Sequence, residues 1–325
     1  MKKALVLLLI LTTLVGVSIL AYTLLLGKRN VQNSIEGATV STKQSSENVT
    51  HIFMCADDGN AMPTCTTIAS VLSNSASDEK INVHIVSFDD NHMSEENIKK
   101  IEKLGTTIKK FNLDFTYFDK KRLSKFNTNH WNKAILVKLF GAQLFPNLDK
   151  IIWLDDDVIV LKSLNNIYNK DMDDKYLFGV DVSSEYNKYN GRNCPYWITA
   201  GFGLYNLKEI RKDDFQKDLL NFAKSYPVNG HSDKKYCGGI EEYALTKIPK
   251  DKVNVLPYKY SVMCSMFGGT VYENLDLEDC VILHYAACKP WRDKKYISKK
   301  YLDVWEKYFN MTEYSKELKE TKKAA

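Results

Sequence analysis

Three consecutive aspartates, Asp155, Asp156 and Asp157, follow directly after an apolar run of the sequence. That run, residues 151–154 (IIWL), is typical of a buried parallel strand. Carboxylates at the end of such a strand repel one another and lose hydration, so a cation or strong hydrogen-bond donors must neutralise them. In open α/β sheets, ligands bind beyond the carboxyl ends of the strands. The first hypothesis is therefore a divalent metal site.

A histidine and a lysine late in the chain complete a possible site for a metal and a diphosphate. Alternate side chains of an extended segment point the same way, so Asp155 and Asp157 can face one ion while the middle aspartate faces elsewhere. The apolar segment 280–285 is typical of a strand that ends near His284, and Lys289 follows shortly after it. Carboxylates suit hard cations, and one imidazole is compatible with manganese. A metal would bridge phosphate oxygens while the lysine neutralises the remaining charge.

The elements that must position these residues alternate between strands and helices over the first half of the chain. Their short connections predict a parallel, doubly wound α/β sheet flanked by helices, and the second half is less regular. The expected strands are residues 51–56, 81–88, 107–111, 151–154, 176–181, 201–207 and 280–285. The expected helices are residues 63–72, 94–104, 132–145, 215–226, 241–246 and 299–316.

Residues 4–26 form an uninterrupted stretch of apolar and small residues. At ~1.5 Å rise per residue, a helix of this length reaches about 35 Å, which is enough to cross a bilayer. A cleaved signal peptide, with an apolar stretch of roughly 7–15 residues, is the alternative. We expect residues 1–27 to be a cytoplasmic tip and transmembrane signal anchor, residues 28–50 a flexible polar stem, and residues 51–325 the folded domain.

The charges that flank the apolar stretch are nearly balanced, since Lys2 and Lys3 precede it and Lys28 and Arg29 follow it. The N-terminal amine tips the balance toward a cytoplasmic N-terminus. We therefore expect a single-pass type II membrane protein with its domain in the lumen of the Golgi apparatus or the endoplasmic reticulum. A bacterial inner membrane is the alternative.

Composition narrows the class of protein further. The chain is 44% hydrophobic and 26% charged, which is typical of a globular protein. Its formal net charge of +5 is mild and gives no reason to expect nucleic-acid binding. The seven cysteines include no CxxC pair, so a structural zinc site is not expected. Cys280 and Cys288 could form a disulfide, or the cysteines could be small buried hydrophobic residues.

The order of these motifs resembles that of family-8 glycosyltransferases, which are retaining enzymes of the GT-A fold and include glycogenin and bacterial galactosyltransferases. The resemblance covers residues 51–291 and implies a Rossmann-like, mostly parallel central sheet in a glycosyltransferase catalytic domain. The family's DxD metal motif is similar to WLDDD in this chain. The resemblance therefore implies that Asp155 and Asp157 bind Mn²⁺ or Mg²⁺ and that Asp156 lies in the donor-binding turn.

Two further segments resemble the motifs that open and close the family's catalytic domain. The closing HxxxxxKPW motif is similar to the segment from His284 to the Lys-Pro-Trp that begins at Lys289. This implies His284 as the third metal ligand and Lys289 as a contact of the diphosphate. The family's first strand ends in a turn that binds the nucleoside, and Ala56, Asp57 and Asn60 match that turn.

Other positions of this chain match positions at which family members bind the donor, and some of them carry a different residue type. Lys138 occupies the place of a Lys or Arg that members have in the helix before DxD, and it is implied as a donor-binding residue. Asp181 is similar to an acid that contacts the donor sugar. Thr199 stands where many members have Asn, so a hydroxyl replaces an amide in a hydrogen bond to the donor or acceptor. Glu241 and Glu242 stand in the helix start where many members have an Asp-Gln-Asp motif, and they are candidate catalytic groups.

Together these features predict a metal-dependent hexosyltransferase. It would move a hexose from a UDP-sugar, with retention, to a hydroxyl acceptor on a glycan, glycoprotein or glycolipid. We expect same-face attack, and a covalent adduct on Glu241 or Glu242 is the alternative. One rival is a haloacid-dehalogenase-type phosphatase, which DxDxV resembles, although that motif normally opens its domain. Another is a catalytically degenerate, lectin-like membrane protein that uses the same cleft.

Overall fold

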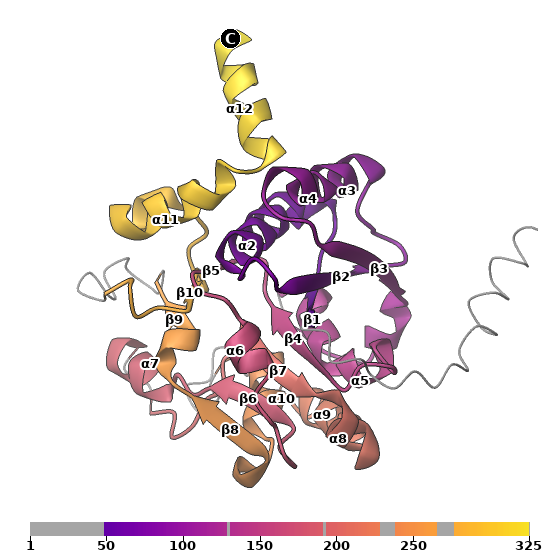
Figure 1. Cartoon of the computed structure of the whole chain (residues 1–325). Coiled ribbons are helices and arrows are strands. Elements are labelled where there is room, and N and C mark those ends of the chain that lie inside the picture. The colour runs from indigo at the N-terminus through magenta and orange to yellow at the C-terminus, as the bar shows by residue number, and fades with distance from the viewer. Residues whose placement is uncertain (1–48, 129–130, 191–192, 228–237, 265–275, 325) are drawn as a thin grey trace, which may run out of the picture. The chain divides into compact units, whose positions relative to one another are not determined.

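The computed structural model describes residues 49–128, 131–190, 193–227, 238–264 and 276–324. These residues form a mixed α/β domain with a seven-stranded sheet of order β3-β2-β1-β4-β7-β6-β8 and a three-stranded sheet of order β5-β10-β9 (Figure 1). The strands of the larger sheet are β1 (Val49–Cys55), β2 (Lys80–Phe88), β3 (Asn112–Phe118), β4 (Lys150–Leu154), β6 (Leu177–Val180), β7 (Phe202–Asn206) and β8 (Val253–Leu256). Those of the smaller sheet are β5 (Val158–Val160), β9 (Val262–Met263) and β10 (Ile282–His284).

Strand directions confirm the mostly parallel sheet in its first half. Strands β3, β2, β1 and β4 run parallel to one another, and β6 runs parallel to β8. Strand β7 is antiparallel to both β4 and β6, which the sequence did not predict. In the smaller sheet, β10 is antiparallel to β5 and parallel to β9. The chain therefore passes from β4 through the acidic turn into β5 and so changes sheets at the aspartates.

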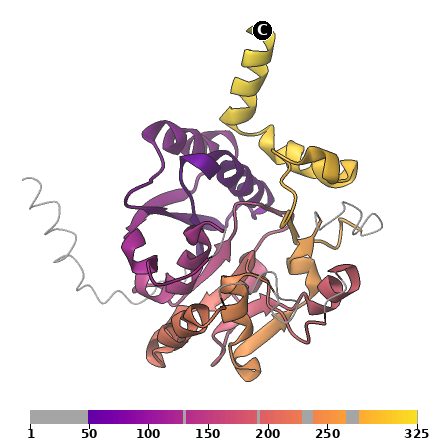
Figure 2. The ribbon, with the colours of Figure 1, turned by 180° about the vertical axis from the view of Figure 1, so that it is seen from behind.

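Helices cover both faces of the larger sheet. The α-helices are α2 (Ala61–Asn74), α3 (Glu95–Glu102), α4 (Leu104–Thr107), α5 (Gly141–Leu144), α6 (Asn165–Tyr168), α7 (Ser183–Asn190), α8 (Leu207–Lys212), α9 (Phe215–Lys224), α10 (Ile240–Thr246), α11 (Lys299–Phe309) and α12 (Glu313–Ala324). The 3₁₀ helices are η1 (Asp58–Asn60), η2 (Lys120–Leu123), η3 (Lys133–Phe140), η4 (Lys250–Lys252), η5 (Tyr258–Tyr260) and η6 (Lys294–Tyr296). Helix α11 lies beside α2 in both views (Figures 1 and 2).

Alternate residues of the central strands pack into two different cores. Ile52 and Ile152 belong to the core that also contains the buried face of α2. Phe53 and Trp153 lie in the core on the opposite face, with their ring centroids 4.7 Å apart. Because both faces of β1 and β4 are covered, these strands are continuously apolar, as expected for central parallel strands. The buried strand before the aspartates is thus fixed in position on both sides.

Three expected elements differ from the structure. The strand predicted at 107–111 is wrong, because α4 extends to Thr107 and β3 spans 112–118. Strand β3 is an edge strand with exposed and half-buried residues, so its alternating pattern is weak. The helix predicted at 132–145 is divided into η3 and α5, because all residues from 136 to 140 are buried and one helical face cannot bury them.

The helix predicted at 299–316 is also divided, into α11 and α12. The hydroxyl of Thr312 donates to the Phe309 carbonyl at 2.8 Å at the junction. Side-chain bonds of this kind compete with helix continuation. The break lets α11 pack on α2 while Tyr314 of α12 donates to Asn97 of α3 at 2.7 Å.

The apolar stretch at 4–26 lies outside the described residues, and so does almost all of the predicted stem. Among the residues that the structure describes, no helix is both long enough and apolar enough to cross a bilayer.

Candidate active site

The structure brings together the three residues predicted as metal ligands. Asp155 directly follows β4, Asp157 directly precedes β5, and His284 is the last residue of β10. Strand β10 pairs with β5 so that His284 lies opposite Val158, which places its side chain beside the acidic turn. One ligand atom from each of the three residues lies within 4.8 Å of the others. Two sheets and a turn therefore form the cluster from distant parts of the chain.

The cluster is largely buried and strongly charged. Asp157 is 7% exposed and His284 is 5% exposed, and Asp157 Oδ1 lies 3.3 Å from His284 Nε2. Burial disfavours the charged form of Asp157, but the Lys289 ammonium and the His284 imidazole outweigh it and hold its pKa well below the usual range. Burial likewise opposes protonation of His284, but the Asp157 carboxylate outweighs it and raises the pKa of the imidazole.

The donor atoms of this cluster fit a divalent cation. In the described structure, the buried His284 Nδ1 makes no hydrogen bond, and the buried Asp157 Oδ1 has only the 3.3 Å ion-pair contact with His284 Nε2. Buried polar atoms nearly always have a partner, so the unpaired imidazole nitrogen and the incompletely paired carboxylate oxygen have room for a further one. Two carboxylates and one imidazole suit manganese, and carboxylates alone suit magnesium.

Lys289 lies at the same cluster. Its Nζ contacts Asp157 Oδ2 and donates to the carbonyl oxygens of Tyr285 and Ala286, at 2.9 and 3.1 Å. Burial would lower the pKa of this lysine, but the adjacent Asp157 outweighs burial and raises it, so the side chain stays protonated. Lys289, the predicted diphosphate contact, is therefore a positive charge held in place beside Oδ2 of Asp157, which is a predicted metal ligand.

Lys138 contacts a different predicted ligand, Asp155. It is only 1% exposed, and its Nζ donates to Asp155 Oδ1 at 3.0 Å and to the Ala200 carbonyl at 2.9 Å. The same ammonium lies 4.7 Å from the centre of the Trp153 ring, and Trp153 Nε1 donates to Asp155 Oδ1 at 2.7 Å. Lys138 therefore orients the side chain of a predicted metal ligand.

Trp153 was not among the predicted site residues. It lies two residues before Asp155, and alternate residues of a strand share a face, so this spacing is the signal that could have identified it.

The predicted nucleoside turn lies directly against the middle aspartate. Asn60 Nδ2 donates to Asp156 Oδ2 at 2.6 Å, and the Asp57 backbone donates to Asn60 Oδ1 at 2.7 Å. Asp57 in turn caps η1 by accepting from the Gly59 backbone at 2.8 Å. The Ala56 backbone donates to Val86 in β2 at 3.0 Å, which holds the turn on the sheet. Burial and the neighbouring Asp157 raise the pKa of Asp156 to about 7.

Two of the residues predicted on the sugar side leave buried polar atoms unpaired. Thr199 is 1% exposed, and its Oγ1 has no hydrogen-bond partner in the described structure. Glu241 Oε2 is likewise buried without a hydrogen bond. Burial raises the pKa of Glu241 to about 8, against an opposing effect of the nearby Lys138. Unpaired buried atoms of this kind are candidates for contact with a bound sugar.

The remaining two predicted acids are held by backbone groups. Asp181 Oδ1 accepts from the Ser183 and Trp197 backbones at 2.9 and 3.1 Å, so only its Oδ2 is left for a ligand. Glu242 Oε2 accepts from the Gly239 backbone at 3.0 Å at the start of α10. Burial raises the pKa of Glu242.

The cysteines correct one expectation. Cys280 and Cys288 are both free thiols, so the disulfide considered between them is wrong. Cys280 is buried and packs with the aromatic cluster of α11, as expected for a small hydrophobic residue. Cys194 is disulfide-bonded.

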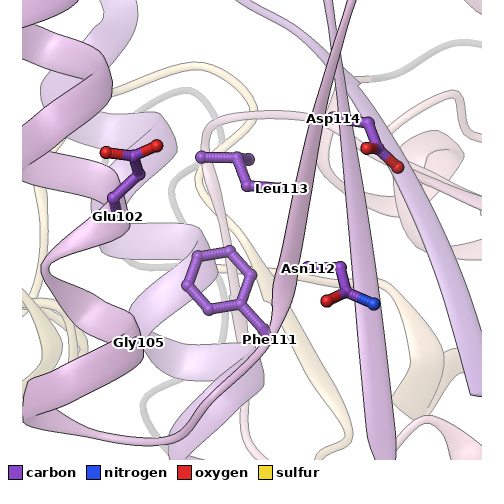
Figure 3. Close-up of a pocket in the computed structure, with 6 residues that line it drawn as sticks. All are labelled: Glu102, Gly105, Phe111, Asn112, Leu113 and Asp114. Atoms are coloured by element: carbon purple, nitrogen blue, oxygen red, sulfur yellow. The ribbon is translucent and has the colours of Figure 1, made fainter.

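A surface hollow lies elsewhere, between α3, α4 and the start of the edge strand β3 (Figure 3). Figure 3 shows Phe111 and Leu113 on one side of the strand and Asn112 and Asp114 on the other, so their side chains do not converge. None of the predicted site residues lines it; its lining residues are Glu102, Gly105, Phe111, Asn112, Leu113 and Asp114.

Comparison with known proteins places this geometry in a family. The sequence model described as Glycosyl transferase family 8 matches residues 51–295. General stress protein A of Bacillus subtilis is 21% identical over 289 residues, covering 83% of this chain and 96% of that protein. Lipopolysaccharide 1,2-glucosyltransferase of Escherichia coli is 24% identical over 252 residues, covering 73% and 71% of the two chains. Probable galacturonosyltransferase 10 of Arabidopsis thaliana is 22% identical, covering 85% of this chain and 58% of that protein.

Solved structures show the same fold at low sequence identity. The galactosyltransferase LgtC, in complex with donor and acceptor sugar analogues, superposes with a TM-score of 0.60 at 20% identity, covering 81% of this chain and 96% of that one. The bifunctional glycosyltransferase WbbM gives a TM-score of 0.65 at 17% identity, covering 86% of this chain and 52% of that one. The architecture is consistent with the predicted GT-A class. The chain belongs to glycosyltransferase family 8 and is therefore a transferase of glycosyl groups.

Proposed function

We propose that this protein transfers a hexose from a UDP-sugar to a hydroxyl acceptor, with retention of configuration and with dependence on manganese or magnesium. The acceptor would be a glycan, a glycoprotein or a glycolipid. The observation that supports the proposal best is the convergence of Asp155, Asp157 and His284 within 4.8 Å, next to the protonated Lys289. Carboxylate, imidazole and ammonium groups at one point suit a metal-bound diphosphate.

The donor would lie along the carboxyl end of the larger sheet. When bound, the metal would supply positive charge to the diphosphate oxygens. Lys289 would add a second positive charge, and Asp157 holds its ammonium in place. Asn60, which is bonded to Asp156, would keep the nucleoside turn against the diphosphate site.

The sugar would lie toward Glu241 and Thr199. Each has a buried oxygen with no hydrogen bond to any described residue, and a sugar hydroxyl would satisfy each of them. Because burial raises the pKa of Glu241 to about 8, its carboxyl can donate as well as accept a hydrogen bond at neutral pH. Asp181 would contact the sugar through Oδ2, since its Oδ1 already accepts two backbone bonds.

Same-face attack fits this arrangement best. The bond between the sugar and the phosphate oxygen breaks, the bond between the sugar and the acceptor oxygen forms, and the acceptor's proton passes to the departing UDP phosphate. A carboxyl that is protonated at neutral pH is a poor nucleophile, which argues against a covalent adduct on Glu241. The preorganised positive charge of Lys289 would stabilise the leaving group.

The test is manganese-dependent release of UDP from a panel of UDP-hexoses by the wild-type protein and two variants. We expect Asp157→Asn and His284→Ala to lose more activity than the ~10–100-fold that loss of an outer-shell metal partner costs. Asp303→Asn is the control, because within the part of the chain that the structure describes this exposed residue pairs only with the exposed Lys299, at 2.8 Å. Unchanged turnover in both site variants would refute the assignment. A wild-type protein that binds a glycan but releases UDP from no donor would favour a lectin-like role.

We also propose that residues 4–26 anchor the catalytic domain to a membrane as a type II protein, in the Golgi apparatus, the endoplasmic reticulum or a bacterial inner membrane. The support is the uncharged apolar length of that stretch. Full-length protein should pellet with membranes and resist extraction by carbonate, whereas a variant that begins at residue 48 should stay in the supernatant. Full-length protein that is released by carbonate would contradict the anchor.

A further inference from the structure

The imidazole of His284 lies directly against the backbone of Gly201. A Cβ atom built on Gly201 would be 2.3 Å from His284 Cε1, 2.6 Å from Nδ1 and 2.8 Å from Nε2. Real Cβ contacts are essentially never below 3.0 Å, so any side chain at position 201 would force the ring to move. The ring has little room to do so, because His284 is buried and its backbone lies in β10 between β5 and β9.

Backbone conformation does not explain this glycine. Among the described residues, Gly238 is the one glycine with a positive φ, so Gly201 has a conformation that other residues can adopt. The requirement at position 201 is therefore space for the imidazole. An alanine would fit the backbone, and the three atoms nearest to its Cβ would all belong to the His284 ring.

The same short segment also fixes Asp155. The Gly201 carbonyl accepts from the Asp155 backbone at 3.0 Å. The adjacent Ala200 carbonyl accepts from Lys138 Nζ at 2.9 Å, and that ammonium holds Asp155 Oδ1 at 3.0 Å. The two residues just before β7 thus contact the Asp155 backbone, the lysine that holds the Asp155 carboxylate, and the imidazole of the cluster.

We propose that Gly201 is a positioning residue of the metal centre: its missing side chain forms the slot that holds the His284 imidazole toward Asp157. This inference rests on the proposed metal site. Outer-shell groups that orient a metal ligand typically contribute about 10–100-fold to metal affinity. We expect Gly201→Ala to weaken Mn²⁺ binding by at least about tenfold, with the loss transmitted entirely through His284.

The experiment is a double-mutant cycle on Mn²⁺ affinity, measured by the electron paramagnetic resonance signal of free Mn²⁺. The four proteins are the wild type, Gly201→Ala, His284→Ala and the double variant. If Gly201 acts through the imidazole, adding Gly201→Ala to His284→Ala should change the affinity by less than about threefold, because the clash is gone. Melting temperatures without metal should show the same non-additivity, which also identifies a variant that fails to fold.

Gly203→Ala, in β7 two residues after Gly201, is the matched control. Its Cβ would meet Leu177 at 3.0 Å and Tyr205 at 3.1 Å, which is a tight apolar contact away from the cluster. We expect it to lower the melting temperature and leave Mn²⁺ affinity unchanged. Wild-type affinity in Gly201→Ala, or a full tenfold loss that persists in the His284→Ala background, would overturn the inference alone. Absence of Mn²⁺ binding by the wild-type protein would instead overturn the proposed metal site, and the inference with it.

Discussion

Replacement of Lys138 by methionine tests how the acidic cluster is balanced. Methionine keeps much of the length and volume of the lysine but removes its positive charge. The variant loses the bonds to Asp155 and Ala200 and the contact with the Trp153 ring. Asp155 is left beside two further aspartates with one fewer positive charge to oppose their repulsion.

The size of the effect follows from burial. Removal of one partner of a fully buried ion pair costs about 3–5 kcal/mol, because an uncompensated charge remains. The Asp155 side chain is 27% exposed and keeps its bond from Trp153 Nε1, so water and the indole offset part of this cost. We expect a loss of about 1–3 kcal/mol in the free energy of unfolding. At ~2–4 °C per kcal/mol, a loss of about 2 kcal/mol lowers the melting temperature by roughly 4–8 °C.

A bound divalent cation should reverse part of this loss. The cation would neutralise the carboxylates that Lys138 no longer offsets, so Mn²⁺ should raise the melting temperature of Lys138→Met by more than it raises that of the wild type. Thermal scans with and without Mn²⁺ measure both differences. Lys133→Met is the control on the same 3₁₀ helix, because among the described residues Lys133 Nζ donates only to the Leu123 carbonyl, at 3.0 Å. The reasoning is wrong if the two lysine variants lose equal stability. It is also wrong if Mn²⁺ does not reduce the difference in melting temperature between Lys138→Met and the wild type.

Three further predictions concern stability. Burial, with the nearby His84, lowers the pKa of His51 from 6.5 to about 4. The unfolded state therefore binds the proton first as the pH is lowered. Stability is lost as pH falls from about 6.5 to 4. Thermal scans over that range should show a shallower loss for His51→Gln than for the exposed His92→Gln, and equal slopes would contradict this. Burial raises the pKa of Glu241 from 4.5 to about 8. The metal-free folded state therefore keeps a proton that the unfolded state releases. Stability is lost as pH rises from about 4.5 to 8. Glu241→Gln should lessen that loss relative to the exposed Glu95→Gln, whereas a parallel pH profile would argue against the raised pKa. Phe53→Ala should lower the free energy of unfolding, measured in urea, by about 3–5 kcal/mol, because the fully buried ring packs against Trp153. A loss below about 1 kcal/mol would show that neighbouring side chains fill the space.

The sequence predicted the central strand and its acidic end well, because both depend on local pattern. An unbroken apolar run predicts a strand buried on both faces, and β4 has that environment. Family motifs in the right order then predicted the family, which the family match confirms. The grouping of Asp155, Asp157 and His284 followed from the same motifs, and the structure places the three side chains together. Their role as metal ligands stays a prediction.

Local pattern failed where neighbours distant in the chain decide the outcome. Edge strand β3 was misplaced by several residues, because an edge strand is only partly buried and its alternation is weak. The long helix before the aspartates became largely 3₁₀, because packing on several sides buries consecutive residues. The considered pairing of Cys280 with Cys288 was also wrong.

The sequence by itself determined which residue types are present at the site, and the tertiary structure decided what each of them touches. Lys138 is predicted from sequence to bind the donor, and only the fold shows that its ammonium is bonded to Asp155. Nothing in the local sequence marks Glu241 as unusual, and its pKa rises to about 8 through burial in the folded chain, with the nearby Glu242 and Asp155 adding to the effect. The need for a glycine at position 201 comes from a ring that arrives from β10. Distances, burial and electrostatic fields depend on segments that meet only in the folded chain, so no local spacing of residues encodes them.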